Sequence, residues 1–67
     1  MTDAQFTALS KLIRLRASPS AEAARLMLVR GMSRNHAAER AGCTADAARK
    51  AAARVQSALD LARIAAG

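Results

Sequence analysis

The stretch NHAAERAGCTADAARKAAARV, residues 35–55, decides how this chain folds. Alanine on both sides favours one continuous helix, yet Gly42, Cys43 and Thr44 interrupt it. Glycine readily adopts the left-handed backbone that ends a helix, and threonine caps the start of the next one. The stretch therefore predicts two helices joined by a tight turn, one over about 34–41 with Ser33 as its cap and one from residue 45 onward.

Earlier in the chain, similar start and stop signals predict two more helices. Thr2 and Gln5 have the spacing of a capping box, and they predict a helix over about 3–16. Ser18 and Pro19 predict the start of a second helix, which Gly31 closes. No alternating pattern typical of strands occurs. We therefore expect one all-α domain over residues 1–67, a four-helix helix-turn-helix fold in which the last helix is long.

The joint at 42–44 has the features that a helix-turn-helix requires. Ala38 lies in the middle of the first helix, where a small side chain lets the second helix cross closely. Gly42 occupies the turn. The residues expected to be buried between the helices are Ala37, Ala41, Cys43, Ala48, Ala51 and Val55. The alternative is a plain helical hairpin without a nucleic-acid role. The motif places a DNA-binding unit at about residues 34–55.

The charge of the chain favours a polyanionic partner. Lys and Arg number 11 against 5 acidic residues, a formal net charge of +6. A GC-rich genome would also enrich Ala and Arg, but it would not explain where the charges fall. A chain of 67 residues has a marginal core, which often needs a disulfide, a metal or a second subunit. One Cys and one His make neither a disulfide nor a metal site, so we expect no metal or cofactor and favour a homodimer.

The outward side of the last helix is the candidate reading surface for double-stranded DNA. The predicted base contacts are Ala45, Asp46, Arg49, Lys50 and Ala53. Arginine donates two hydrogen bonds to guanine, and a small alanine can touch a thymine methyl. For Asp46 the alternative is a purely structural role at the positive end of the helix dipole. The predicted phosphate contacts are Arg34, Asn35, Thr44 and Arg54.

Other polar residues have more ordinary interpretations. Lys11, Arg14 and Arg16 cluster at the end of the first helix, either as a flanking grip on phosphates or as a solvated face. His36 is expected on the surface. Cys43 is expected to be a small core residue, because a redox sensor needs an exposed thiol of lowered pKa.

These residues together resemble the KorA/TrfB-type transcriptional repressors of plasmids over about residues 2–59. The opening of that family stands here as Thr2, Gln5 and Phe6. The second helix carries its pattern at Glu22, Ala24, Arg25, Leu28, Val29 and Gly31. The helix-turn-helix centre carries it at Ala38, Gly42, Thr44, Ala47, Ala51, Arg54 and Val55.

The resemblance implies a dimeric repressor that binds a palindromic operator and controls genes of a mobile element. At the base-reading positions the family carries Ser-Gln, whereas this chain has Arg49 and Lys50, so the operator sequence does not carry over. The family also has a separate dimerisation domain after the helix-turn-helix, and this chain stops before it.

The C-terminal residues 58–67 are apolar almost all round, which predicts burial against something outside this small domain. Leu59 and Ala62 continue the inner stripe of the helix, whereas Leu61 and Ile64 point elsewhere. We expect Leu61 and Ile64 to form a dimer interface, with Leu15 joining them. The alternative is a frayed tail.

Other functional classes fit less well. A small helical inhibitor or adaptor that offers its Leu61 and Ile64 face to another protein is the main alternative. A basic amphipathic membrane binder conflicts with the Pro, Gly and cap punctuation of a folded unit. No signal peptide or membrane span is visible, which suggests a cytoplasmic protein. No catalytic constellation occurs, so we do not expect an enzyme.

Overall fold

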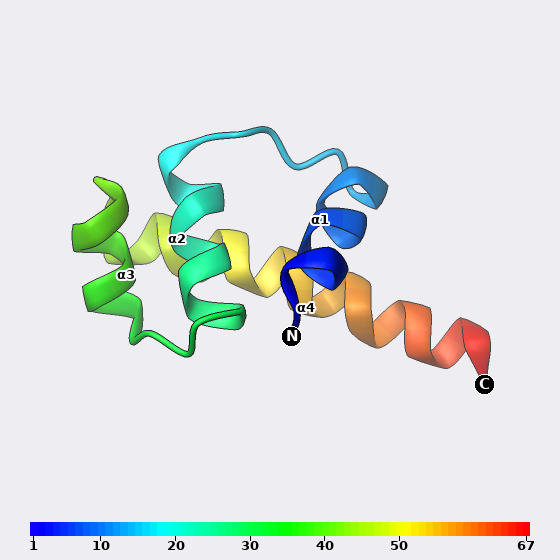
Figure 1. Ribbon diagram of the computed structural model, residues 1–67. Helices are drawn as coiled ribbons and strands as arrows, with labels where there is room; N and C mark the ends of the chain where they lie inside the picture. The colour runs from blue at the N-terminus through cyan, green and yellow to red at the C-terminus, as the bar shows by residue number, and fades with distance from the viewer.

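The computed structural model describes residues 1–67 and contains four α-helices and no strand. They are α1 (Asp3–Leu12), α2 (Pro19–Leu28), α3 (Arg34–Ala41) and α4 (Ala45–Ala66). Figure 1 shows α4 running along one side of the molecule, with α3 beside its first turns and α1 farther along it. Helix α2 lies between α1 and α3. The predicted all-α fold with a long last helix is confirmed.

Each helix begins at the capping residue that the sequence predicts. The side chains of Thr2, Ser18, Ser33 and Thr44 each accept a hydrogen bond from the backbone N–H three residues later, at 3.1–3.2 Å. The Gln5 side chain also accepts from the Thr2 N–H at 2.9 Å, which completes the predicted capping box. These bonds satisfy N–H groups that lack a partner inside the helix.

Helix α1 is shorter than predicted, because it ends at Leu12 rather than near residue 16. Arg14 has a φ of 55°, in the left-handed region that normally favours glycine. The Arg14 N–H donates to the Lys11 carbonyl at 3.2 Å, and the Leu15 N–H donates to the Ser10 carbonyl at 2.8 Å. This pair of bonds is a Schellman ending, and it turns Leu15 back onto the core.

The two glycine signals have different outcomes. Gly42 is the C-cap of α3 with a φ of 82°, and it ends that helix as predicted. Gly31 is also left-handed, with a φ of 73°, but it follows the C-cap Val29 by two residues. The Met32 N–H, directly after Gly31, donates to the Leu26 carbonyl at 3.1 Å, a bond over six residues that closes the end of α2.

The core consists of two clusters that share α2 and α4. The first cluster comprises Phe6, Leu9, Ala24, Ala51, Ala52, Val55 and Ala58. The second comprises Ala23, Leu26, Ala37, Ala38 and Ala48. Most of these buried residues are alanine, so the helices approach closely and little volume is filled by large side chains.

The predicted burial is mostly confirmed. Ala37, Ala38, Ala48, Ala51 and Val55 are buried. Ala41 and Cys43 are half-buried against the second cluster. The prediction for Ala62 was wrong, since it is exposed together with all residues of 60–67. In Figure 1 this end of α4 extends beyond α1, where no other helix covers it.

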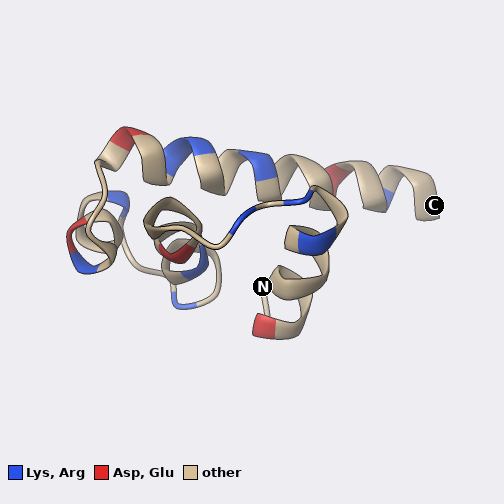
Figure 2. Cartoon of the chain, turned by 90° about the horizontal axis from the view of Figure 1, so that it is seen from above, with Lys and Arg blue, Asp and Glu red and all other residues tan.

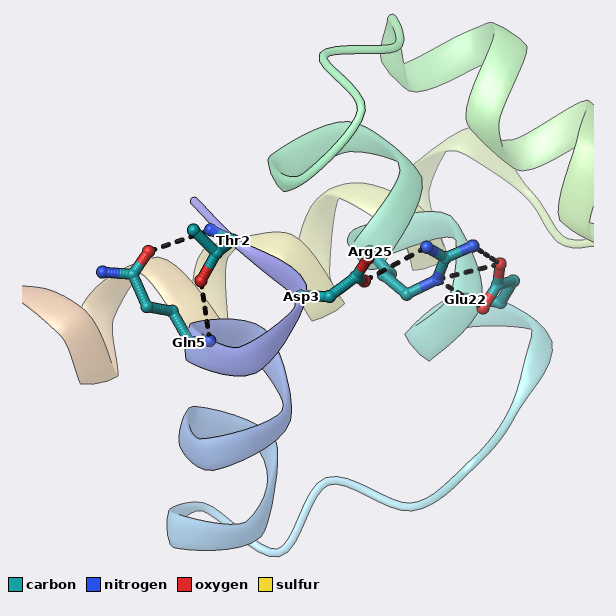
Figure 3. A network of polar contacts seen from close by, with 5 residues as sticks. All are labelled: Thr2, Asp3, Gln5, Glu22 and Arg25. Atoms are coloured by element: carbon teal, nitrogen blue, oxygen red, sulfur yellow. Dashed lines mark hydrogen bonds and ion pairs between the residues drawn. The ribbon is translucent and has the colours of Figure 1, made fainter.

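A polar contact ties α1 to α2, as Figure 3 shows. The Arg25 guanidinium donates to both oxygens of Glu22 and, at 3.3 Å, to Asp3 at the start of α1. The hydrogen bond from Arg25 is the main cause that holds the pKa of Glu22 below its ordinary value, against a smaller opposing effect of desolvation. Glu22, an acidic residue in the first turn of α2, thus anchors Arg25 in addition to its favourable interaction with the helix dipole.

Candidate nucleic-acid interface

The α3–α4 joint fixes the direction in which α4 presents its outer side. Ala37 and Ala48 are fully buried and Ala38 is 3% exposed, all in one cluster with Leu26 of α2. The Gly42 and Cys43 N–H groups both donate to the Ala38 carbonyl, at 2.9 and 3.0 Å. The turn is therefore hydrogen-bonded and packed on three helices, which is the arrangement of a helix-turn-helix.

The outer side of α4 carries an exposed set of residues that we term the reading face, namely Asp46, Arg49, Lys50 and Ala53. Their spacing of three and four residues places them on one side of the helix, opposite buried Val55. Figure 2 shows cations in the first half and middle of α4 and again near its C-terminal end. Ala45 lies apart from this set, because it is half-buried against the second core cluster.

Within the reading face, both cations pair with the same carboxylate. Arg49 donates to Asp46 Oδ1 at 2.9 Å, and Lys50 Nζ lies 3.1 Å from Asp46 Oδ2. The hydrogen bonds from Arg49 and then Lys50 hold the pKa of Asp46 below its ordinary value. Asp46 is thus ionised at neutral pH and holds both cationic heads near the start of α4. The spacings i,i+3 and i,i+4 are the sequence signal for this pairing, which the sequence interpretation did not use.

The predicted phosphate ligands lie in α4, at its N-cap and in the first turn of α3. Thr44 Oγ1 accepts the Ala47 N–H at 3.1 Å and keeps its own proton free to donate. Arg34 and Asn35 are exposed in the first turn of α3. Arg54 is exposed, and its Nη2 donates to the Ile13 carbonyl at 3.4 Å. The fold therefore brings Arg54 to the end of α1, a contact between residues 41 positions apart.

The comparisons with known proteins agree with this geometry. The sequence profile of the family described as TrfB plasmid transcriptional repressor (KorA) matches residues 1–67. The chain belongs to this family. The match covers the whole chain and so extends beyond residues 2–59, which carry the resemblance. No curated protein and no solved structure matches the chain.

The members of this family are described as plasmid transcriptional repressors, which are regulators and not enzymes. None of the helices has the length and apolar character needed to cross a membrane.

The apolar end of this TrfB-family chain differs in one respect from the prediction. Leu61 and Ile64 are 67% and 75% exposed, so nothing within the domain covers them. Leu15, expected to join them, is instead half-buried against the first core cluster. The exposed apolar residue of α1 is Leu12, at 69%.

Proposed function

We propose that the chain is a cytoplasmic, sequence-specific DNA-binding regulator that reads the major groove with α4. Its simplest role is repression of its own operon or of another operon of a mobile element. The observation that carries this proposal is the reading face: Arg49 and Lys50 are exposed at the start of a helix that α3 and α2 hold rigidly. Family membership supports the role of repressor.

In this proposal the reading face contacts base edges. Arg49 donates to N7 and O6 of a guanine, and Lys50 to a neighbouring acceptor. Ala53 leaves room for the helix to lie deep and can touch a thymine methyl. Asp46 either accepts from a cytosine amino group or restricts Arg49 to one orientation through their 2.9 Å hydrogen bond. Ala45 is half-buried, so only the exposed part of its side chain contacts DNA.

The phosphate contacts come from the groups at the edges of α4. The exposed first turn of α3 offers Arg34, Asn35 and backbone N–H groups at the positive end of the helix dipole. The Thr44 hydroxyl donates to a phosphate while it continues to cap α4. Arg54 contacts the backbone farther along the groove. These contacts position the protein, and the reading face supplies specificity.

We also propose a homodimer in which the ends of two α4 helices pack antiparallel. Leu61 and Ile64 lie on one side of the helix, and Asp60 and Arg63 lie beside them. A two-fold axis between antiparallel helices places Asp60 opposite the partner's Arg63, so the surface is complementary to itself. Such a dimer would bind two half-sites of a palindrome spaced by about one helical turn, roughly 34 Å.

A footprint on the natural operator tests the proposal. Genome-wide immunoprecipitation from the source bacterium supplies the operator, and DNase protection is then compared between the wild type and Arg49→Ala/Lys50→Ala. We expect the double variant to lose protection, since each good base contact contributes about 1–3 kcal/mol of discrimination. Arg30→Ala/Arg40→Ala removes two exposed charges outside the reading face and should keep protection.

Protection that is unchanged by Arg49→Ala/Lys50→Ala would show that α4 is not the reading helix. In that case the exposed Leu61 and Ile64 would favour the other candidate function, a small helical inhibitor or adaptor that binds another protein through this face.

A further inference from the structure

The segment 11–16, at the end of α1, carries three exposed cations that no acidic group neutralises. Lys11, Arg14 and Arg16 are exposed and none of them forms an ion pair. The sequence has no Asp or Glu between Asp3 and Glu22, and Glu22 is paired with Arg25. We call residues 11–16 the flanking segment. Its charge is therefore available to an anion outside the protein.

The backbone of the flanking segment is held in a conformation that does not suit its own sequence. Arg14 occupies the left-handed position of the Schellman ending at a φ of 55°, where glycine is the usual residue. A residue with a side chain is strained there, and strain that persists at an exposed cation points to a function for that cation. A glycine at this position would make the turn without strain but would remove the charge.

The flanking segment is fixed in position beside α4. The Ile13 carbonyl accepts the 3.4 Å hydrogen bond from Arg54, and the Ile13 side chain packs against the first core cluster, which includes Val55. In Figure 2 the connection between α1 and α2 carries cationic residues next to the end of α1. Arg14 directly follows the residue that Arg54 contacts, and Arg16 lies two positions farther on, whereas Thr44 is the N-cap of α4.

The flanking segment meets Arg54 well away from the start of α4. Thr44 and Arg54 are ten residues apart along α4, which corresponds to about 15 Å at 1.5 Å per residue. We infer that Arg14 and Arg16 bind backbone phosphates next to the phosphate that Arg54 contacts, farther along the groove than the phosphate that Thr44 contacts. This inference rests on the proposed function.

The salt dependence of DNA binding tests the inference. Affinity for a mixed-sequence duplex of about 30 base pairs is measured by fluorescence anisotropy between about 50 and 200 mM NaCl. For Arg14→Gly/Arg16→Ala we expect the slope of log K against log salt to fall in magnitude by about 1.8, which is 0.9 for each of two phosphates. Between about 50 and 200 mM NaCl, the fold-loss of affinity should therefore be roughly 12 times smaller for the variant than for the wild type.

Two further variants separate this effect from folding and from net charge. Glycine relieves the strain at residue 14, so Arg14→Gly/Arg16→Ala should melt no lower than the wild type by circular dichroism. Arg14→Lys/Arg16→Lys keeps the charges and should keep most of the slope. Arg30→Ala/Arg40→Ala lowers the net charge by the same two units from exposed positions outside the flanking segment and α4.

The inference is overturned if Arg14→Gly/Arg16→Ala changes the slope no more than Arg30→Ala/Arg40→Ala does. That result would leave the proposed function intact, provided that the wild type binds the duplex and Arg49→Ala/Lys50→Ala abolishes the operator footprint. A wild-type chain that binds no duplex at all would overturn both the inference and the proposed function.

Discussion

Three neighbouring residues at the α3–α4 joint each have a separate physical role. Gly42 adopts the left-handed backbone that ends α3, half-buried Cys43 packs against the second core cluster, and Thr44 caps α4. Together they set the angle at which α4 leaves the turn. A change at any one of them should therefore alter the stability or the orientation of α4 and not the chemistry of its exposed surface.

Gly42→Ala provides the clearest test at the level of single residues. A Cβ at Gly42 would meet no atom within 4 Å, so the only cost is the left-handed backbone, about 1–2 kcal/mol of unfolding free energy. Urea denaturation should show this loss. Gly67→Ala, at the C-terminal end of α4, should leave the stability unchanged. Equal stability of Gly42→Ala and the wild type would contradict this account of the turn.

Among the elements, α1 is the helix whose attachment depends most on a few contacts. Phe6 and Leu9 bury its inner side against α4, and Arg25 joins its first turn to α2 through Asp3. The same guanidinium is held by Glu22. Because these ion pairs are partly exposed, their contribution to the free energy of unfolding is modest. That contribution still matters for α1, since this helix buries only a small surface.

Glu22→Gln should weaken this attachment in a pH-dependent manner. The pKa of Glu22 is lower in the folded protein than in the unfolded chain, so its contribution is present above the ordinary value of 4.5 and is lost as the pH falls through the folded pKa. We expect Glu22→Gln to lose about 0.5 kcal/mol at neutral pH.

The difference between the wild type and Glu22→Gln should then disappear in acid, which thermal melts across pH 2–7 can follow. Glu39→Gln, at an exposed carboxylate of α3 without an ion pair, is the matched control and should show no such difference. If the difference in thermal stability between the wild type and Glu22→Gln is the same at every pH in this range, the ion pair is not its cause.

As a whole, the molecule combines an alanine-rich core with one helix that extends past it. Nine of the thirteen buried residues are alanine, so the helices pack closely but bury little apolar surface. The end of α4 adds Leu61 and Ile64 to the exposed surface. Burial of these side chains in a second copy would add apolar contacts that the isolated domain lacks.

Leu61→Glu/Ile64→Glu tests the dimer. We expect the wild type to sediment as a dimer at micromolar concentration. The variant should be a monomer, with the dissociation constant raised at least about 100-fold, because four charges would enter one apolar interface. Leu12→Glu places a charge on the exposed apolar residue of α1 and should leave the dimer intact. A monomeric wild type, or a dimeric double variant, would exclude this interface.

Most of the fold could be predicted because its signals are local. The caps at Thr2, Ser18, Ser33 and Thr44 depend only on residues up to three positions away, and each was correctly placed. The burial of Ala38 and Val55 and the exposure of Arg49 and Lys50 follow from helical periodicity. The contact roles of these exposed residues remain predictions.

Other features depend on contacts between distant parts of the chain. The residues around Arg14 do not indicate that its backbone is left-handed. In the structure α1 ends early, and Leu15 packs on the core. Ala62 has the periodicity of a buried residue but is exposed, because no helix reaches that far along α4.

The sequence by itself thus determined the four helices, their capped starts and the cationic side of α4, since backbone hydrogen bonding and helical periodicity act over a few residues. Only the tertiary structure decided where α1 ends and that Arg54 contacts Ile13 just after that end. The reason is physical: such positions depend on which surfaces, distant in sequence, bury one another.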